Sequence, residues 1–305
     1  MENKSKIIVF LRGGLGNQMF QYSAGFDFAR KINGELFLDT TFLNDRFPRA
    51  GFTYRKYDLD VFNINPQFTK LSKISSSLKI PGIWLFSDLM MTKLQNKFGN
   101  LEVVKERDNN YFSKLNEAIE TNSKSYFLFG YFQSEKYFID SAKELRNEFS
   151  FKNEFSDNEK KIADRIKNLN SVSIHIRRGD YIISKKAKRV MKELGSDYYK
   201  KAIGEISKKI SDPHFFVFSD DIEWCKENLK IEFPTEYIGN DTAGYKNSRH
   251  LQLMSLCKHN IIANSSFSWW GAWLNNNPGK IVIAPKDWFN DRDENDLVPH
   301  VWKRV

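Results

Sequence analysis

The chain has 305 residues, of which 41% are hydrophobic and 15% aromatic, so it has the composition of a folded protein rather than a disordered one. This length is enough for two domains of ordinary size, each with its own core. The formal net charge of +9 favours anionic partners, but the sequence lacks the zinc-finger spacing and the aromatic signatures of nucleic-acid-binding modules.

The cysteines, Cys225 and Cys257, are too few for a disulfide framework, and the histidines show no paired metal-ligand spacing. We therefore expect no metal site. The apolar run Ile7–Leu11 is too short for the core of a signal peptide or for a membrane span. We expect a cytoplasmic protein whose basic charge could hold it against the inner face of an anionic membrane.

The first half begins with the pattern of an open α/β sheet. Lys6–Leu11 is an apolar strand, and the glycine-rich turn RGGLGN follows it at 12–17. From 17 to 32, apolar residues recur at every fourth position on one face of a helix, and ELFLD at 35–39 predicts a second strand. The turn lacks the lysine of a Walker motif and the full G-x-G-x-x-G pattern, so alone it identifies no ligand.

The region from 45 to 125 is less regular, and it contains one predicted helix at 110–121. SYFLFGYF at 125–132 predicts a strand that ends in an aromatic turn. Ser134 is a suitable N-cap for a helix over 135–148.

A polar, turn-rich stretch predicts a domain boundary, which divides the chain into residues 1–155 and 156–305. The second domain alternates strands with helices through short links. This alternation predicts a mostly parallel sheet with helices on both faces. The predicted strands are at 172–177, 214–219, 260–264 and 280–285, and the predicted helices are at 197–210, 221–229, 248–258 and 266–276.

Three polar clusters follow three of these predicted strands. They are HIRRGD at 175–180, SDD at 219–221 and NSSFSWW at 264–270. In open α/β sheets, ligands bind beyond the carboxyl ends of the strands. We therefore expect the three clusters to line one ligand site.

Arg177 and Arg178 are adjacent on an extended segment, so their side chains point to opposite sides. One guanidinium could bind a pyrophosphate through paired N–H donors, while the other forms a structural ion pair. Arg177 shares a face with His175, and we therefore assign Arg177 to the ligand. The alternative is that both arginines form structural pairs.

Asp220 and Asp221 could serve a metal, a ribose or the paired N–H donors of a guanine edge, or they could cap the helix that follows. Ser265 and Ser266 begin a predicted helix, where amides and hydroxyls form an anion site or a simple N-cap. The tryptophans of the same helix are spaced as core residues.

Four stretches together resemble the α-1,2-fucosyltransferases of glycosyltransferase family 11. One of them, HIRRGDY, matches the H-x-R-R-x-D element that α-1,2-, α-1,6- and protein O-fucosyltransferases share. The stretches follow the order typical of the family and span most of the chain. They are GGLGNQMFQYSAG at 13–25, GYFQSEKYF at 130–138, HIRRGDY at 175–181 and LMSLCKHNIIANSSFSWWGAWLN at 253–275.

The resemblance implies a GT-B fold, in which two Rossmann-like α/β domains face each other across a cleft. It implies that residues 1–155 form the acceptor-side domain and that residues 156–305 bind GDP-β-L-fucose. The implied reaction is an inverting transfer of L-fucose to the 2-hydroxyl of a galactose, without a metal or other cofactor. The acceptor would be a galactose-containing oligosaccharide or lipid-linked glycan of surface polysaccharide or O-antigen synthesis.

The resemblance also implies roles for individual residues. Arg177 takes the position of the donor pyrophosphate contact, His175 lies beside the nucleotide, and Asp220 meets guanine. The other implied positions are Ser265, Ser266 and Phe267 in the phosphate loop, and Gly14, Gly16 and Asn17 in the glycine turn, where Asn17 faces the donor sugar and the acceptor.

Two questions about single residues stay open. His250 stands where the family pattern has an aspartate, before the L-x-L-M-S run. Asp180 is a candidate general base, but a salt bridge to Arg178 would explain it equally well, and Glu35 or Asp39 could take the proton instead.

Other classes of function make different demands. A non-catalytic GDP-sugar-binding module would bind nucleotide without transfer, and a fucosyltransferase of another linkage would share the donor site. A protein of nucleic acids or membrane surfaces would bind polyanions in a salt-dependent way. An adhesion protein that displays Arg178-Gly179-Asp180 would need export, for which the sequence gives no signal.

Overall fold

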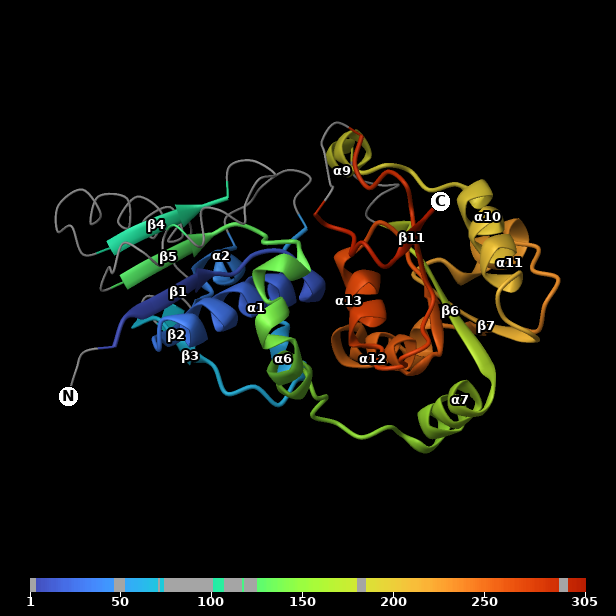
Figure 1. Ribbon diagram of the computed structural model, residues 1–305, viewed down its shortest axis with the longest axis horizontal. Coiled ribbons are helices and arrows are strands. Elements are labelled where there is room, and N and C mark those ends of the chain that lie inside the picture. Colours follow the sequence, from blue (N-terminus) through green and yellow to red (C-terminus); the bar gives the residue numbers. More distant parts are fainter. Residues whose placement is uncertain are drawn as a thin grey trace. The chain divides into compact units, whose positions relative to one another are not determined.

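The computed structural model describes residues 4–46, 53–70, 72–73, 101–106, 117, 125–179, 185–290 and 296–305. The chain forms two compact units, Met1–Ser150 and Phe151–Val305, each with its own parallel sheet (Figure 1).

The division falls after Ser150, whereas the sequence placed the boundary between 155 and 156. The buried guanidinium of Arg249 gives a physical reason. It donates hydrogen bonds to the backbone oxygens of Asn153, at 2.8 Å, and Glu154, so these residues belong to the second unit.

The sheet of the first unit has parallel strands in the order β3-β2-β1-β5-β4. Central β1 brings Ile8 opposite Phe37 of β2 and Phe127 of β5. The predictions of a first strand and of a strand at 35–39 are confirmed, while β3 and β4 lie where the sequence pattern is irregular. The bounds are Lys6–Phe10 for β1, Glu35–Asp39 for β2, Gln67–Phe68 for β3, Leu101–Lys105 for β4 and Ser125–Phe129 for β5.

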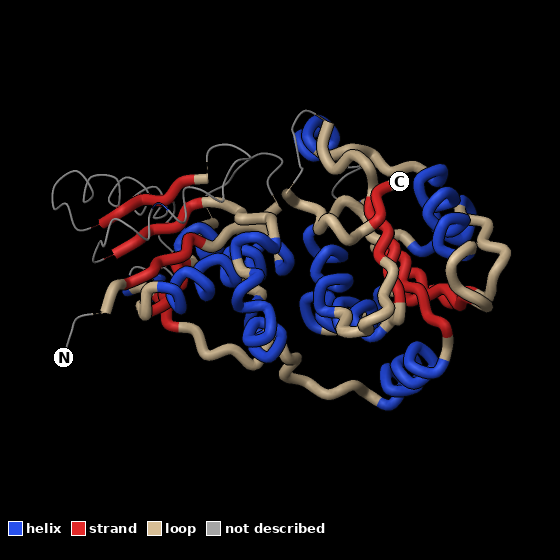
Figure 2. The backbone as a smooth tube through the Cα atoms, in the orientation of Figure 1, coloured by secondary structure: helices blue, strands red, loops and turns tan. Residues whose placement is uncertain are grey.

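The main helix of the first unit, α1, spans Leu15–Lys31 and packs against β1 and β2 (Figure 2). Gly25 allows this close approach, because a Cβ there would lie 2.3 Å from Val9 Cγ2. The shorter helical segments are α2 at Thr41–Asn44, η1 at Leu59–Val61, η2 at Glu135–Tyr137, η3 at Ile139–Ser141 and α6 at Ala142–Glu148.

The predicted helix over 135–148 is wrong in its first half. Ser134 does cap a helical turn, since its side chain accepts a hydrogen bond from Lys136 N, but that turn ends at Phe138, with φ −147° and ψ 15°. Phe138 is fully buried and packs against Phe20, with ring centroids 6.1 Å apart. Packing of this ring therefore overrides local helix propensity. The helix predicted at 110–121 lies outside the described residues, apart from position 117.

The predicted strand that ends in an aromatic turn is confirmed at 125–132, with the strand over Ser125–Phe129 and the turn at Tyr131 and Phe132. The amides of Tyr131 and Phe132 bond instead to the Glu106 carboxylate, and Phe132 has a φ of +52°. Such a conformation is rare for a bulky residue and breaks the extended chain.

The sheet of the second unit has parallel strands in the order β11-β10-β9-β6-β7-β8. Central β6 is buried from Ser171 to Ile176. The four predicted strands are confirmed, whereas β8 and β11 were not predicted. The bounds are Asn170–Ile176 for β6, Pro213–Ser219 for β7, Thr235–Ile238 for β8, His259–Ile261 for β9, Val282–Ala284 for β10 and Lys303–Arg304 for β11.

Helices cover both faces of this sheet, with α10 and α11 on one face and α12 and α13 on the other (Figure 1). A capping box between Ser156 and Glu159 begins α7, a helix that was not predicted from the sequence. The helices are α7 at Asp157–Asn168, α9 at Lys185–Val190, α10 at Ser196–Ser207, α11 at Ile222–Asn228, η4 at Asn240–Thr242, η5 at Tyr245–Asn247, α12 at Ser248–Leu256 and α13 at Ser266–Leu274.

A buried polar network joins the end of α12, the strand β9 and the end of α13. Asn275 Nδ2 donates to Cys257 O at 2.7 Å and to Asn260 Oδ1 at 2.8 Å. Asn260 Nδ2 in turn donates to Ser173 Oγ at 2.7 Å and to Met254 O at 2.9 Å. These bonds explain two asparagines of the 253–275 motif as structural residues.

We expect Asn275→Ala to lower the free energy of unfolding of the second unit by about 2–3 kcal/mol, because it leaves buried oxygens without a donor. Urea unfolding followed by circular dichroism measures this loss. Asn276→Ala is the matched control, since Asn276 is exposed, and it should change stability by less than about 0.5 kcal/mol. Equal effects of the two substitutions would contradict the structural role of Asn275.

Candidate active site

The ends of β6 and β7 form the centre of the candidate site. Because these parallel strands place Ile176 opposite Ser219, the residues that follow them are neighbours. They are Arg177 and Asp220, with 3.0 Å between Nη1 and Oδ2 and with 22% and 24% of their side chains exposed. The half-buried ion pair thus sits at the carboxyl edge of the sheet.

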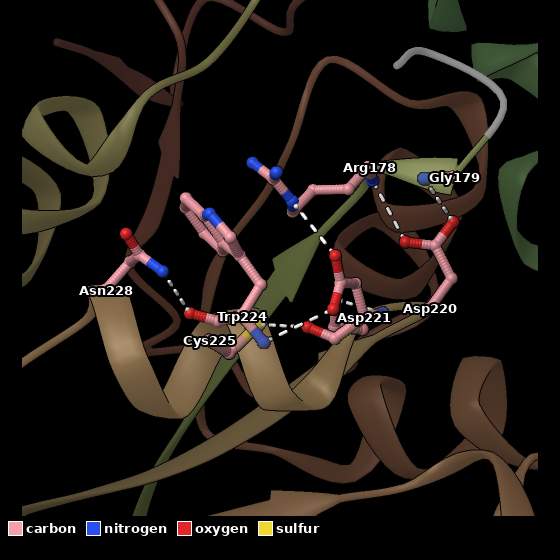
Figure 3. A network of polar contacts seen from close by, with 8 residues as sticks. Arg178, Gly179, Asp220, Asp221, Trp224, Cys225 and Asn228 are labelled. Carbon is pink, nitrogen blue, oxygen red and sulfur yellow. Dashed lines mark hydrogen bonds and ion pairs between the residues drawn. The ribbon is translucent and has the colours of Figure 1, made fainter. Parts of the chain in front are cut away.

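Asp220 also fixes the path of the chain as it leaves β6 (Figure 3). Its oxygens accept hydrogen bonds from Arg178 N at 2.9 Å and from Gly179 N at 3.1 Å. A Cβ on Gly179 would lie 2.7 Å from Asp220 Oδ2. The close approach therefore requires glycine at position 179.

Arg178 points to the other side, as the alternation of an extended segment predicts. Its Nε lies 3.2 Å from Asp221 Oδ2, and its guanidinium carbon lies 3.8 Å from the ring centroid of Trp224 (Figure 3). Asp221 also caps α11 by accepting from Trp224 N at 3.2 Å. The structural ion pair predicted for Arg178 is confirmed, with Asp221 as its partner, while Asp180 lies outside the described residues.

The two adjacent aspartates therefore have different surroundings. The predicted helix cap is confirmed for Asp221. Both oxygens of Asp220 are engaged by Arg177 and by backbone amides, so a guanine edge would have to share or replace these bonds.

His175 is buried next to this ion pair, with 6% of its surface exposed, and its Nδ1 has no hydrogen-bond partner among the described residues. Its ring centroid lies 5.5 Å from that of Phe267 in the first turn of α13. Burial, then the positive charge of Arg177 and lastly the electrostatic influence of the neighbouring His250 ring, lower the pKa of His175 to about 3. The imidazole is therefore neutral at pH 7.

Ser265 is the N-cap of α13, because its hydroxyl accepts a hydrogen bond from Phe267 N at 3.3 Å. Ser266 is half-buried and begins the helix. The Trp269, Trp270 and Trp273 side chains are buried, as the sequence predicted. The start of α13 thus lies beside β6 through the contact of Phe267 with His175.

The glycine turn of the first unit is held by two buried glutamines. Gln18 donates to Gly13 O and Lys56 O, both at 2.8 Å. Gln21 accepts from Arg12 N at 3.1 Å and donates to Gly130 O at 2.9 Å. The glutamines of the 13–25 motif therefore have structural roles.

Gly13 has a φ of +82°, and a Cβ there would lie 2.5 Å from Asn17 Nδ2. Gly14 is half-buried at the N-cap of α1, and Gly16 is buried in its first turn. Asn17 is half-buried, and its Oδ1 accepts a hydrogen bond from Gln133 Nε2 at 2.8 Å. The 130–138 motif therefore supports the 13–25 motif directly.

Comparison with known proteins agrees with this arrangement of motifs. The model of glycosyl transferase family 11 matches residues 2–303. The chain belongs to this family. An "Alpha-1,2-colitosyltransferase" of Escherichia coli is 35% identical, over 99% of each chain. The "O-antigen biosynthesis glycosyltransferase WbnK" of Escherichia coli is 34% identical, over 96% of this chain and 98% of the relative.

A solved structure shows the same fold. The GDP complex of a point mutant of Arabidopsis thaliana FUT1 has a TM-score of 0.50 and 10% identity, and the match covers 97% of this chain and 72% of that one. The two parallel α/β units have the GT-B architecture that the sequence predicted.

The described part of this family 11 protein includes two of the candidate bases, Glu35 and Asp39, and the histidine at an expected acidic position, His250. Glu35 begins β2, at the edge opposite the strand carboxyl ends. Asp39 is buried and accepts from Thr41 N at 2.8 Å. His250 packs edge-on against Phe218, and its Nε2 lies 2.9 Å from Gly239 O. Burial lowers the pKa of His250, so a neutral ring occupies the position where the resemblance led us to expect an acid.

Within the described residues, no three or more histidine, cysteine or acidic side chains are grouped so that they could hold a metal ion. None of the helices in the described part of the chain has the length and apolarity needed to cross a bilayer.

Sequence reasoning missed two residues that support the site. Gln133 orients Asn17, and Glu106 holds the amides of Tyr131 and Phe132 just before Gln133. Gln133 lies within the 130–138 motif, which was the available signal. Glu106 lies in the irregular region, where no pattern distinguishes it.

The buried histidines predict a loss of stability in acid. In the unfolded chain the His175 side chain binds a proton below about pH 6.5. In the folded protein its pKa is about 3, so it stays neutral between these two pH values. The contribution of His175 is therefore full above pH 6.5 and is lost as the pH falls towards 3. We expect His175→Phe to flatten the dependence of unfolding free energy on pH between 6 and 4, by up to about 1.4 kcal/mol per pH unit.

Urea unfolding at a series of pH values measures this slope. His300→Phe is the control, because His300 is exposed on the same unit. Parallel curves for wild type and His175→Phe would show that His175 is not the group responsible.

The Asn17–Gln133 contact predicts coupled substitutions. Gln133→Leu should lower kcat/KM for sugar transfer by about tenfold or more, because it frees the Asn17 amide to rotate. In an Asn17→Ala background the same change should cost little further. Gln67→Leu, at an exposed position of β3, is the control. Additive losses at positions 17 and 133 would argue against this positioning role.

Proposed function

We propose that the protein is an inverting, metal-independent α-1,2-fucosyltransferase, which moves L-fucose from GDP-β-L-fucose to the 2-hydroxyl of a galactose, most simply a terminal one. The observation that carries this proposal is the half-buried Arg177 at the end of β6, held by Asp220 beside the neutral His175 and the start of α13. His175, Arg177 and the start of α13 lie within two of the motifs that resemble the fucosyltransferases of family 11, while Asp220 lies outside the four motifs.

Negative charge develops on the leaving GDP as the bond to the sugar breaks, and the transition state resembles an oxocarbenium ion. Arg177 would stabilise this charge through N–H donors aimed at the pyrophosphate. The first turn of α13 adds its helix dipole and the residues Ser265, Ser266 and Phe267. A neutral His175 would contribute hydrogen bonding beside the nucleotide, and Asp220 would meet guanine by sharing its present bonds.

In this proposal the second unit binds the donor, and the first unit takes the acceptor and contacts the donor sugar through Gly14, Gly16 and Asn17. The acceptor hydroxyl attacks the anomeric carbon from the face opposite GDP, and a base removes its proton. Asp180 is the base that we propose. Glu35 and Asp39 are less suitable, because one lies at the wrong edge and the other is buried.

A second donor sugar has specific support. The relative that is 35% identical over nearly the whole chain is named for α-1,2 transfer of colitose. The linkage is thus common to both candidates, while the sugar differs. The second relative is named for O-antigen biosynthesis, which supports a glycan of surface polysaccharide as acceptor. We place the reaction in the cytoplasm, with peripheral contact at the inner face of the membrane through the basic charge.

A donor and acceptor panel tests the proposal. The purified protein is incubated with GDP-fucose, GDP-colitose or GDP-mannose, each with lactose and N-acetyllactosamine as acceptors, and the product linkage is determined by NMR. We expect a 2-linked fucosyl galactose whose formation does not require a divalent cation. Transfer of colitose alone would select the second candidate. Binding of GDP without transfer or donor hydrolysis would identify a non-catalytic module.

We expect Arg177→Ala to weaken GDP binding and to lower kcat by about 10²–10³, by analogy with the removal of one oxyanion-hole donor. Arg177→Lys keeps the charge without the planar fork and should recover only part of the loss. Arg165→Ala is the matched control, because Arg165 is a half-exposed arginine of the same unit that pairs with Glu236. Near-normal transfer by Arg177→Ala would remove Arg177 from the donor site.

A further inference from the structure

The first residue of the glycine turn, Arg12, is stacked on two aromatic rings. Arg12 follows β1, and its guanidinium carbon lies 4.2 Å from the ring centroid of Tyr131 and 4.9 Å from that of Phe129. Its Nε is buried and has no hydrogen-bond partner among the residues that the structure describes. In the described part of the chain, no carboxylate lies within ion-pair distance of Arg12, in contrast to Arg177 and Arg178.

Hydrogen bonds fix both the backbone of Arg12 and the turn that carries the Tyr131 ring. The Arg12 amide donates to the buried Gln21 side chain at 3.1 Å. The Tyr131 ring that the guanidinium contacts belongs to a turn whose amides bond to Glu106. Cation–π attraction positions the charge over the rings without supplying an oxygen acceptor for its N–H donors. A ligand would therefore meet a pre-organised set of donors.

Two further positive side chains lie near the rings and the turn around Arg12, and the Glu106 carboxylate in this region is engaged by the amides of Tyr131 and Phe132. Lys105 Nζ lies 5.6 Å from the centroid of the same Phe129 ring. On the other side, a Cβ on Gly14 would lie 3.9 Å from the guanidinium carbon of Arg55. The first turn of α1 contains no acidic residue, and its N-cap is Gly14, which has no side chain to cap the helix. These charges, together with the helix dipole, favour an anion at the turn.

We propose that Arg12 and Tyr131 form a substrate subsite for an anionic group, a carboxylate or a phosphate. The inference rests on the proposed function, in which the first unit takes the acceptor. The acceptor would then carry an acidic group near the galactose that receives the sugar, and the guanidinium of Arg12, a half-buried residue, would bind this group by charge-assisted hydrogen bonds. The same chemistry would also fit a phosphate of the donor, and the experiment separates these two sources.

The test compares two disaccharide acceptors that differ only in a carboxylate. In one, galactose is linked to glucose, and in the other it is linked in the same way to glucuronic acid. For wild type we expect a higher kcat/KM with the acidic acceptor and a preference that weakens with added salt. Arg12→Gln should lower the ratio of acidic to neutral kcat/KM by about tenfold, which corresponds to about 1.4 kcal/mol. Arg12→Lys should lower it less, because it keeps the charge but loses the fork.

Lys143→Gln is the matched control, since it removes one exposed positive charge of the same unit, on α6, and should leave the ratio unchanged. A general loss of surface charge would move the ratio in both variants and would overturn the subsite. Thermal unfolding of each variant establishes that it is folded.

Calorimetric titration with GDP separates the two sources of the anion. Weaker GDP binding by Arg12→Gln would support the subsite and assign it to the donor phosphate, whereas a changed acceptor ratio with normal GDP binding would assign it to the acceptor. Unchanged values in both measurements would overturn the proposal. If wild type transfers no sugar, the proposed function fails, and binding of the acidic disaccharide to wild type and Arg12→Gln still decides the subsite.

Discussion

The Asp220 carboxylate is the constraint on which the candidate donor site depends. It joins the ends of the two longest strands of the second sheet, and its oxygens serve one guanidinium and two backbone amides. A carboxylate only accepts hydrogen bonds, so the contact fixes both the position of Arg177 and the direction in which the chain leaves β6. The turn at Gly179 and the opposite placement of Arg178 follow from it.

The electrostatics of the site follow from the same pair. Arg177 and Asp220 offset each other, and burial keeps His175 and His250 neutral. The positive potential that the site offers to an anion then depends on the remaining guanidinium donors and on the start of α13. The site therefore resembles the anion sites that α/β folds build at the carboxyl ends of their strands from backbone and guanidinium groups.

The sequence predicted those parts of the fold that have a local pattern. Alternation in β6, the apolar run of β7 and the four-residue spacing of α1 are all properties of the segments themselves. The two-residue strand β11 has no such pattern, because it exists only by pairing with β10. The break at Phe138 and the positive φ of Phe132 depend on Phe20 and Glu106, which are distant in the sequence. The engagement of Asp220 likewise required the register of β6 against β7.

The placement of the tryptophans gives the second unit its own spectroscopic signal. Every tryptophan except Trp84 lies in this unit, and Trp269, Trp270 and Trp273 form a buried cluster on α13 with Trp302 beside Trp269. Trp224 lies on α11, the helix that Asp221 caps, and its ring stacks against the Arg178 guanidinium. Intrinsic fluorescence therefore reports mainly on the second unit, and quenching or a spectral shift on nucleotide addition would test without a label whether that unit binds it.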